Sequence, residues 1–91
     1  MSTDTATDVL IARWIAPNPH KAGVADAWVM PRHISVWAVI GQLALEHDDI
    51  ASVADQYDLP QEAVEAALAY YARHRAEVDA RLDANRAPFE P

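Results

Sequence analysis

Two amphipathic segments, separated by a tight break, dominate the pattern of apolar positions along the chain. In each segment the apolar residues recur at three- and four-residue spacing, which places them on one face of a helix: Ile50, Val53, Ala54 and Tyr57, then Val64, Ala67, Leu68 and Tyr71. The break is Asp58-Leu59-Pro60. Asp tolerates a positive φ better than most residues, and Pro suits a helix start because its missing N–H would have no partner there. The pattern predicts a helix-turn-helix unit.

A third helix is predicted just before this unit, over residues 36–46. Ser35 precedes it and is a typical N-cap, because a hydroxyl oxygen accepts a hydrogen bond from a free backbone N–H of the first turn. Asp48 or Asp49 can cap the following helix in the same way. Trp37 and Leu45 lie off the stripe that we expect to be buried, which comprises Val36, Val39, Ile40 and Leu43.

After the break, the helical pattern continues from Pro60 to about residue 84. A helix of this length spans about 37 Å, whereas a small domain is about 30 Å across, so the final turns are expected to overhang. The apolar spacing continues through Val78 and Leu82 in the overhanging part. We therefore expect this end of the helix to pack on a second subunit or on another partner.

The N-terminal third predicts a small sheet. Residues 9–15 (VLIARWI) are dense in β-branched and aromatic residues, which favours a strand that is apolar on both faces. Two further extended pieces are expected at residues 27–30 and 33–34. A strand that is apolar on both faces needs cover on both faces, so this strand also predicts a homodimer.

These elements predict an α+β fold that is mainly α: a small N-terminal antiparallel sheet followed by a three-helix, helix-turn-helix-like unit with a long C-terminal helix. The chain divides into a mobile N-terminus (1–8), a single domain (9–86) and a tail (87–91). Within the domain, residues 9–34 form the strand region and residues 35–86 form the three-helix unit.

Charge narrows the set of partners. The 91 residues include 14 Asp or Glu and 7 Lys or Arg, for a net charge of −7, which repels nucleic acid at long range and favours a basic partner. The chain has no cysteine, no secretory signal pattern and no apolar run long enough to cross a membrane. We expect a cytoplasmic protein without a membrane partner.

Catalytic and metal-binding patterns are absent from the sequence. Asp48 and Asp49 are acidic residues at a helix start, where they are typical cap and dipole partners. The serines lack a base within a recognisable pattern, and two glycines cannot make a phosphate loop. The histidines have no ligand-like spacing (His20, His33, His47 and His74). We expect no enzymatic activity, no metal, no cofactor and no small-molecule substrate.

One stretch of the long helix is a candidate partner-binding surface. Tyr70, Arg73, His74 and Glu77 follow one another at three- and four-residue spacing, next to the expected core residue Tyr71. Tyr and Arg dominate the energetics of many protein interfaces. The alternative interpretation is an ordinary solvated helix face.

Nucleic-acid binding is the competing hypothesis for the helix-turn-helix unit. A recognition helix starting at Pro60 would present acidic and neutral residues to the phosphates (Gln61, Glu62, Glu65 and Ala66), which favours a packing role instead. Basic residues stand in or beside the strand region, at Arg13, Lys21 and Arg32. In a dimer such strands can offer a β-ribbon to a DNA groove, although scattered surface charge explains these residues equally well.

Residues 23–85 resemble the domain-of-unknown-function 433 family of bacteria. The resemblance is carried by Ile34-Ser35-Val36, by Tyr57-Asp58-Leu59 and by the segment ALAYY at residues 67–71. The family's usual Gly-Thr-Arg is replaced by Pro31-Arg32-His33, so His33 occupies the place of the family's Arg.

The resemblance implies a function. The family is similar to VapB-type antitoxins, small proteins that are encoded beside ribonuclease toxins with PIN-like folds and inhibit them. An acidic protein can block a basic RNA-binding cleft. The leading hypothesis is therefore an antitoxin-like regulatory protein that binds a PIN-like ribonuclease toxin. The alternatives are a DNA-binding repressor that recognises operator DNA, perhaps of its own operon, and a structural dimerisation module.

Overall fold

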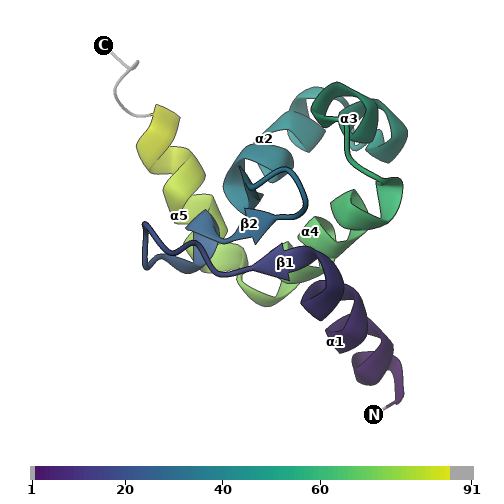
Figure 1. Cartoon of the computed structure of the whole chain (residues 1–91). Helices are drawn as coiled ribbons and strands as arrows, with labels where there is room; N and C mark the ends of the chain where they lie inside the picture. Colours follow the sequence, from purple (N-terminus) through teal and green to yellow (C-terminus); the bar gives the residue numbers. More distant parts are fainter. Residues whose placement is uncertain (1, 87–91) are drawn as a thin grey trace.

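The computed structural model describes the backbone of residues 2–86 and the side chains of residues 5–85. The predicted tail, 87–91, lies outside the described residues. In chain order the elements are α1 (Ser2–Trp14), β1 (Ile15–Ala16), a short 3-10 helix η1 (Val24–Asp26), β2 (Trp28–Val29), β3 (Ile34–Ser35), α2 (Val36–Leu45), α3 (Ile50–Tyr57), α4 (Gln61–Arg73) and α5 (Arg75–Arg86) (Figure 1). The predicted class is confirmed: the fold is mainly α with a small antiparallel sheet on its N-terminal side.

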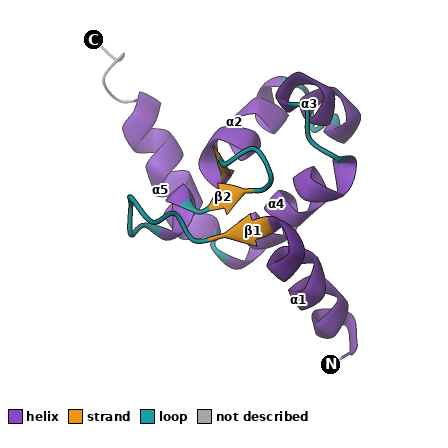
Figure 2. Ribbon diagram, in the orientation of Figure 1, coloured by secondary structure: helices purple, strands orange, loops and turns teal. Residues whose placement is uncertain are grey.

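The sheet is small, with strands of two residues each (Figure 2). Its order is β1-β2-β3, and Val29 of the central strand lies opposite Ile15 on one side and Ile34 on the other. Val29 is fully buried, so the sheet contributes to the core despite its size. The extended piece expected at residues 27–30 is present as the shorter strand β2, and the piece expected at residues 33–34 is present as β3, shifted by one residue.

The strand predicted over residues 9–15 is wrong, because this segment belongs to α1 and only Ile15 joins the sheet. Packing against α4 accounts for the helix. The side chains that are partly buried in α1 recur at helical rather than alternating spacing, namely Thr7, Leu10, Ile11 and Trp14. The segment 1–8, expected to be mobile, is helical from Ser2 onward.

The core lies between the sheet and the helices of the C-terminal two thirds. The stripe predicted on α2 is confirmed, since Val36, Val39, Ile40 and Leu43 are all buried. On the α3 face Val53 and Ala54 are buried, with Ile50 and Tyr57 half-buried beside them. The largest fully buried side chains are Leu43, Val29, Val36, Val39, Val53, Val64 and Val78.

The turn between α3 and α4 has the predicted geometry. Asp49 caps α3, because its carboxylate accepts a hydrogen bond from the Ser52 backbone N–H at 3.1 Å. Asp58 ends the helix in the left-handed region, with φ 56° and ψ 49°. Ser35 precedes α2 as expected, but its side chain makes no capping hydrogen bond.

The single long helix predicted from Pro60 to residue 84 is wrong. The helical path breaks at His74, with φ −132° and ψ 37°, and α5 then folds back against α2 and η1 (Figure 1). This reversal buries Val78 completely and packs Leu82 on the core, which an overhanging helix would leave exposed. The predicted three-helix unit therefore contains four helices.

Gly41 makes the approach of α5 to α2 feasible. A Cβ atom at this position would lie 3.1 Å from Cδ2 of Leu82, which is tighter than an ordinary contact. The glycine therefore leaves room for the Leu82 side chain on the α2 surface.

Candidate protein-binding surfaces

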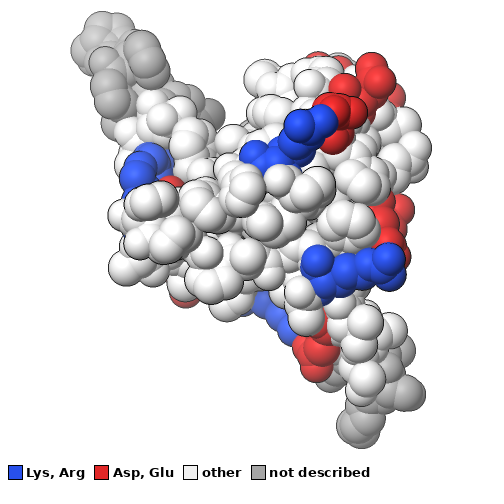
Figure 3. All heavy atoms as spheres, viewed as in Figure 1, with Lys and Arg blue, Asp and Glu red and all other residues white. Residues whose placement is uncertain are grey.

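The helix-turn-helix region carries charge of one sign. Between residues 33 and 72 the sequence contains seven Asp or Glu and no Lys or Arg. Five of these acids are exposed on the α2–α3 loop, α3 and α4, where Figure 3 shows red atoms gathered over α3, and they define what we call the acidic surface: Asp48, Asp49, Asp55, Glu62 and Glu65. Such a surface attracts basic partners and repels nucleic acid.

The other two acids in this region are held by neighbours. Glu46 accepts hydrogen bonds from the Ser52 hydroxyl at 3.2 Å and from the Gln42 amide at 3.1 Å. Hydrogen bonding from Gln56, then from Ser52, lowers the pKa of the Glu46 carboxyl below its ordinary value. This polar group connects the end of α2 to α3. Asp58 forms an ion pair with Arg32.

The start of α4 was expected to expose four residues as a recognition helix would. Gln61, Glu62 and Glu65 are exposed, but Ala66 is fully buried, which corrects that expectation. The helix α1 packs along α4, whereas the sequence predicted a strand for most of that segment. The exposed surface at the start of α4 is therefore acidic.

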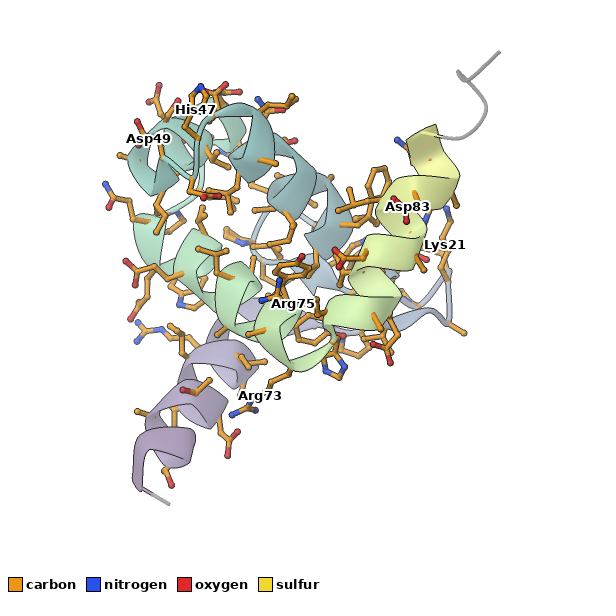
Figure 4. The ribbon with its side chains drawn as sticks, turned by 180° about the vertical axis from the view of Figure 1, so that it is seen from behind. Lys21, His47, Asp49, Arg73, Arg75 and Asp83 are labelled. Carbon is orange, nitrogen blue, oxygen red and sulfur yellow. The ribbon has the colours of Figure 1, made fainter. Side chains whose placement is uncertain are left out.

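The predicted patch of Tyr70, Arg73, His74 and Glu77 is divided in the structure. The Tyr70 hydroxyl donates a hydrogen bond to the Val24 carbonyl at 2.9 Å, and its ring lies tilted by 44° against the His74 ring, with the ring centres 4.5 Å apart. Burial, then the charge of Glu77, raises the pKa of the Tyr70 hydroxyl. The contact between Tyr70 and His74 lies at the helix break. Arg73 instead forms an ion pair with Asp8 of α1. Figure 4 shows Arg73 beside that helix.

Tyr71 differs from the deep core residue that the sequence predicts, because it is only half-buried. Its hydroxyl donates to Oδ1 of Asp79 at 2.7 Å, and the Arg75 guanidinium lies 4.7 Å from the centre of its ring. The hydrogen bond to Asp79, then burial, raises the pKa of Tyr71. Both tyrosines therefore connect α4 to other parts of the fold.

The three basic residues of the strand region are not brought into one patch. Arg13 lies over the Trp14 ring at 5.5 Å, Arg32 is paired with Asp58, and Lys21 borders a small hollow in the loop before η1. In Figure 3 the Lys and Arg atoms form separate groups with uncharged surface between them. Strands of two residues are also too short to form the ribbon that the DNA hypothesis invoked.

A histidine and tryptophan cluster on the sheet was missed by the sequence analysis. The Trp28 ring meets His33 edge-on at 4.7 Å and His20 at 6.0 Å. His33 has a positive φ of 57°, which few residues adopt. His33 is 5 positions and His20 is 8 positions from Trp28, and these spacings correspond to neither a helical nor a strand period. Among the described residues no group of three His, Cys, Asp or Glu is arranged to hold a metal ion.

The second missed feature is an apolar groove of about 480 Å³ between α2 and α5, which we call the α2–α5 groove. Leu45, at its rim, is 75% exposed. On the α5 side, the Arg81 guanidinium lies 4.7 Å from the centre of the Trp37 ring. The apolar side chains and the glycine that line the groove come mostly from α2: Trp37, Ala38, Gly41, Ala44, Leu45, Tyr57 and Leu82.

None of the helices within residues 2–86 combines the length and the apolar content that crossing a membrane requires. Comparison of the chain with protein-family models, with curated proteins and with solved structures found no match.

Proposed function

We propose that this protein is an antitoxin-like regulator that binds a basic ribonuclease of the PIN-like class and blocks RNA cleavage, with the acidic surface as its contact. The observation that carries the proposal is the 40-residue stretch 33–72, which has no Lys or Arg and covers α2, α3 and all of α4 except its last residue, Arg73. A ribonuclease must attract phosphates, so its RNA-binding cleft is basic. An acidic protein surface competes for that cleft by charge complementarity and by steric cover.

The class of toxin comes from the resemblance of residues 23–85 to the domain-of-unknown-function 433 family. The acidic surface supports a basic protein partner but does not by itself distinguish one basic protein from another. A reducing compartment suits a chain without cysteine, and we place the interaction in the cytoplasm.

Operator DNA has less support as a partner. The exposed start of α4 carries Glu62 and Glu65, which repel phosphates, and Ala66 is buried by the fold. The dispersed positions of Arg13, Lys21 and Arg32 provide no continuous basic surface that would compensate.

The test uses the purified chain and a candidate PIN-like ribonuclease, sought among the genes next to the one that encodes this chain. Neutralising Asp55→Asn, Glu62→Gln and Glu65→Gln together should weaken binding on the order of tenfold at low salt, mainly through slower association. RNA cleavage should be restored to the same degree. The difference between wild type and variant should shrink as salt rises from 50 to 200 mM, because screening weakens the attraction that the variant lacks.

The matched control is Glu77→Gln, which changes charge by the same type of substitution on α5. It should leave ribonuclease binding unchanged. If the triple variant binds as tightly as wild type at every salt concentration, the acidic surface is not the contact. If the Glu62→Gln, Glu65→Gln pair instead alters sequence preference on an operator fragment, the DNA hypothesis replaces this one.

A further inference from the structure

The outer side of α2 exposes apolar side chains beside the α2–α5 groove. Of the ten residues of this helix only Gln42 is polar. A helix that is apolar on every side is normally buried on every side. Here one side is buried by the core, whereas Leu45 on the other side is 75% exposed. The groove and the outer side of α2 together have the composition of a surface that binds an apolar segment.

Acidic residues adjoin the groove at its Leu45 end. The next residue, Glu46, places a carboxylate oxygen 3.1 Å from the amide nitrogen of Gln42, which lines the groove. Hydrogen bonds from Gln56 and Ser52 lower the pKa of the Glu46 carboxyl, so this group is ionised at neutral pH. Two exposed acids, Asp48 and Asp49, follow where the chain turns from α2 into α3, and Figure 4 shows Asp49 at that turn.

The other end of the groove, at Trp37, lacks this negative charge. The Arg81 guanidinium lies over the Trp37 ring there, and Nε of Arg81 is 3.4 Å from Oδ1 of Asp26, so the two charges offset each other. Among the described residues that line the groove itself, none is Asp, Glu, Lys or Arg. The charge around the groove is therefore asymmetric, with an uncharged middle and an acidic Leu45 end.

We infer that the α2–α5 groove binds a basic amphipathic helix of a partner protein. The apolar stripe of such a helix occupies the groove, and its Lys or Arg side chains meet Glu46, Asp48 and Asp49. Along α2 the groove runs from Trp37 to Leu45, about 12 Å at 1.5 Å per residue, which accommodates about two helical turns. Partners that bind in this way present apolar anchors at three- and four-residue spacing. The acids at the Leu45 end select basic helices over acidic ones.

Charge favours this occupant over a second copy of the chain. Two copies that each carry a net charge of −7 repel one another, whereas a basic segment is attracted. The apolar segments from which a homodimer was predicted are also used within one chain, because residues 9–14 pack on α4 as part of α1 and the end of the predicted long helix packs on α2 as α5. The inference does not depend on the partner being a ribonuclease.

A designed peptide tests the inference without any natural partner. The probe is a fluorescently labelled peptide of about 14 residues, or about four helical turns, with Leu on one face and Lys on the other. It should bind the full chain saturably at micromolar concentration, measured by fluorescence anisotropy. The same peptide with Glu in place of Lys should not bind. A peptide of the same Leu and Lys content, reordered so that it has no apolar face, should bind on the order of tenfold more weakly.

The apolar part of the contact is tested at Leu45. Leu45→Gln should weaken binding of the Leu/Lys peptide on the order of tenfold, because the anchors of the peptide lose an apolar contact. The substitution should leave the fold intact, since Leu45 is mostly exposed. Val9→Gln is the matched control, because Val9 on α1 is also a large exposed apolar residue, at 63%. It should leave peptide binding unchanged.

The acidic part of the contact is tested by two double variants of equal charge. Asp48→Asn with Asp49→Asn should weaken peptide binding on the order of fivefold at low salt, and the effect should shrink as salt rises. Asn caps a helix as well as Asp does, so α3 should keep its start. The control, Glu62→Gln with Glu65→Gln, removes the same charge at the start of α4 and should leave binding within about twofold of wild type.

The two glycines of the chain give a second measurement, on unmodified protein. Gly41 lines the α2–α5 groove, whereas Gly23 borders the hollow next to Lys21. In NMR spectra of the ¹⁵N-labelled chain, the Leu/Lys peptide should shift the amide resonance of Gly41 and leave that of Gly23 in place. This measurement places the peptide without relying on the stability of any variant.

Several results would overturn the inference. They are equal binding of the Lys and Glu peptides, an unchanged affinity in Leu45→Gln, a loss of affinity in Val9→Gln, a Gly41 resonance that does not move, and equal weakening by the two acidic double variants, which would attribute binding to overall charge. Peptide binding that appears only after removal of residues 87–91 would assign the groove to the chain's own end. A wild type of twice the 10.0 kDa chain mass that binds no peptide would assign it to a second copy. None of these measurements uses a ribonuclease, so their failure is distinct from failure of the proposed function.

Discussion

The hydroxyl of Tyr70 donates a hydrogen bond to the carbonyl oxygen of Val24 at 2.9 Å, and so joins α4 to η1 across 46 residues of sequence. This contact explains why a tyrosine that the helical spacing places outside the core stripe is half-buried. The side chain packs on the core, and its hydroxyl gives the Val24 carbonyl a second hydrogen bond beside the one from the Ala27 backbone N–H. Tyr70 therefore contributes to the stability of the folded chain, whether or not it also contacts a partner.

Replacement of Tyr70 should accordingly reduce stability. Tyr70→Phe removes only the hydroxyl and should cost about 1 kcal/mol, because the hydrogen bond between α4 and η1 is lost, while the Val24 carbonyl keeps its bond from the Ala27 N–H. Tyr70→Ala should cost about 2 kcal/mol or more, because it also leaves a gap beside the core. Urea denaturation followed by tryptophan fluorescence measures both changes. If the free energy of unfolding of Tyr70→Ala lies within about 0.5 kcal/mol of the wild-type value, Tyr70 behaves as an exposed side chain and does not stabilise the fold.

The contact between Gly41 and Leu82 predicts coupling between α2 and α5. Gly41→Ala raises helix propensity by about 1 kcal/mol, but the new Cβ crowds Leu82. In wild type we expect these effects to offset each other. In a Leu82→Ala background the crowding is gone, so the same substitution should stabilise by about 1 kcal/mol. Equal effects of Gly41→Ala in both backgrounds, measured by denaturation, would mean that α5 does not pack on α2 at this point.

The left-handed backbone at Asp58 predicts an unusual response to glycine. Asp58→Gly relieves the cost of φ 56° and loses only an exposed ion pair with Arg32, so stability should stay within about 1 kcal/mol of wild type or rise. Asp55→Gly, three residues earlier within α3, should cost about 1 kcal/mol, because glycine weakens a helix interior. Thermal unfolding compares the two. A loss at Asp58 larger than the loss at Asp55 would contradict the assigned turn.

The features that the sequence predicted well are those specified by local chemistry. The buried stripe of α2 follows from apolar spacing alone, and the turn at Asp58 follows from one residue that tolerates a positive φ next to a proline. Asp49 caps α3 because the cap requires only its own side chain and the N–H of Ser52. Features of this kind depend on residues that are close in the sequence, so they can be predicted without knowing the tertiary contacts.

The features that the sequence missed depend on distant contacts. Residues 9–15 favour a strand by composition, yet packing on α4 makes most of them helical. The break at His74 has no proline or glycine to mark it, and its benefit is the burial of Val78 against elements more than thirty residues away. The α2–α5 groove was missed for the same reason, since it exists only once α5 has folded back. The two candidate surfaces thus differ in how far the sequence predicts them, because the acidic surface follows from the distribution of charged residues and the groove does not.

The hydrogen-bonded carboxylate of Glu46 predicts a loss of stability in acid. Hydrogen bonding from Gln56, then Ser52, lowers the pKa of Glu46 in the folded protein from the ordinary value of 4.5. A lowered folded pKa means that the contribution is fully present above pH 4.5 and is lost as pH falls through the folded value. The melting temperature of Glu46→Gln should therefore fall below wild type by a constant amount above pH 4.5, and the gap should close at lower pH. Ser52→Ala removes one of the donors and should move the Glu46 carboxyl titration, followed by NMR, toward 4.5. A wild-type NMR midpoint at or above 4.5 would show that these hydrogen bonds do not favour the ionised form.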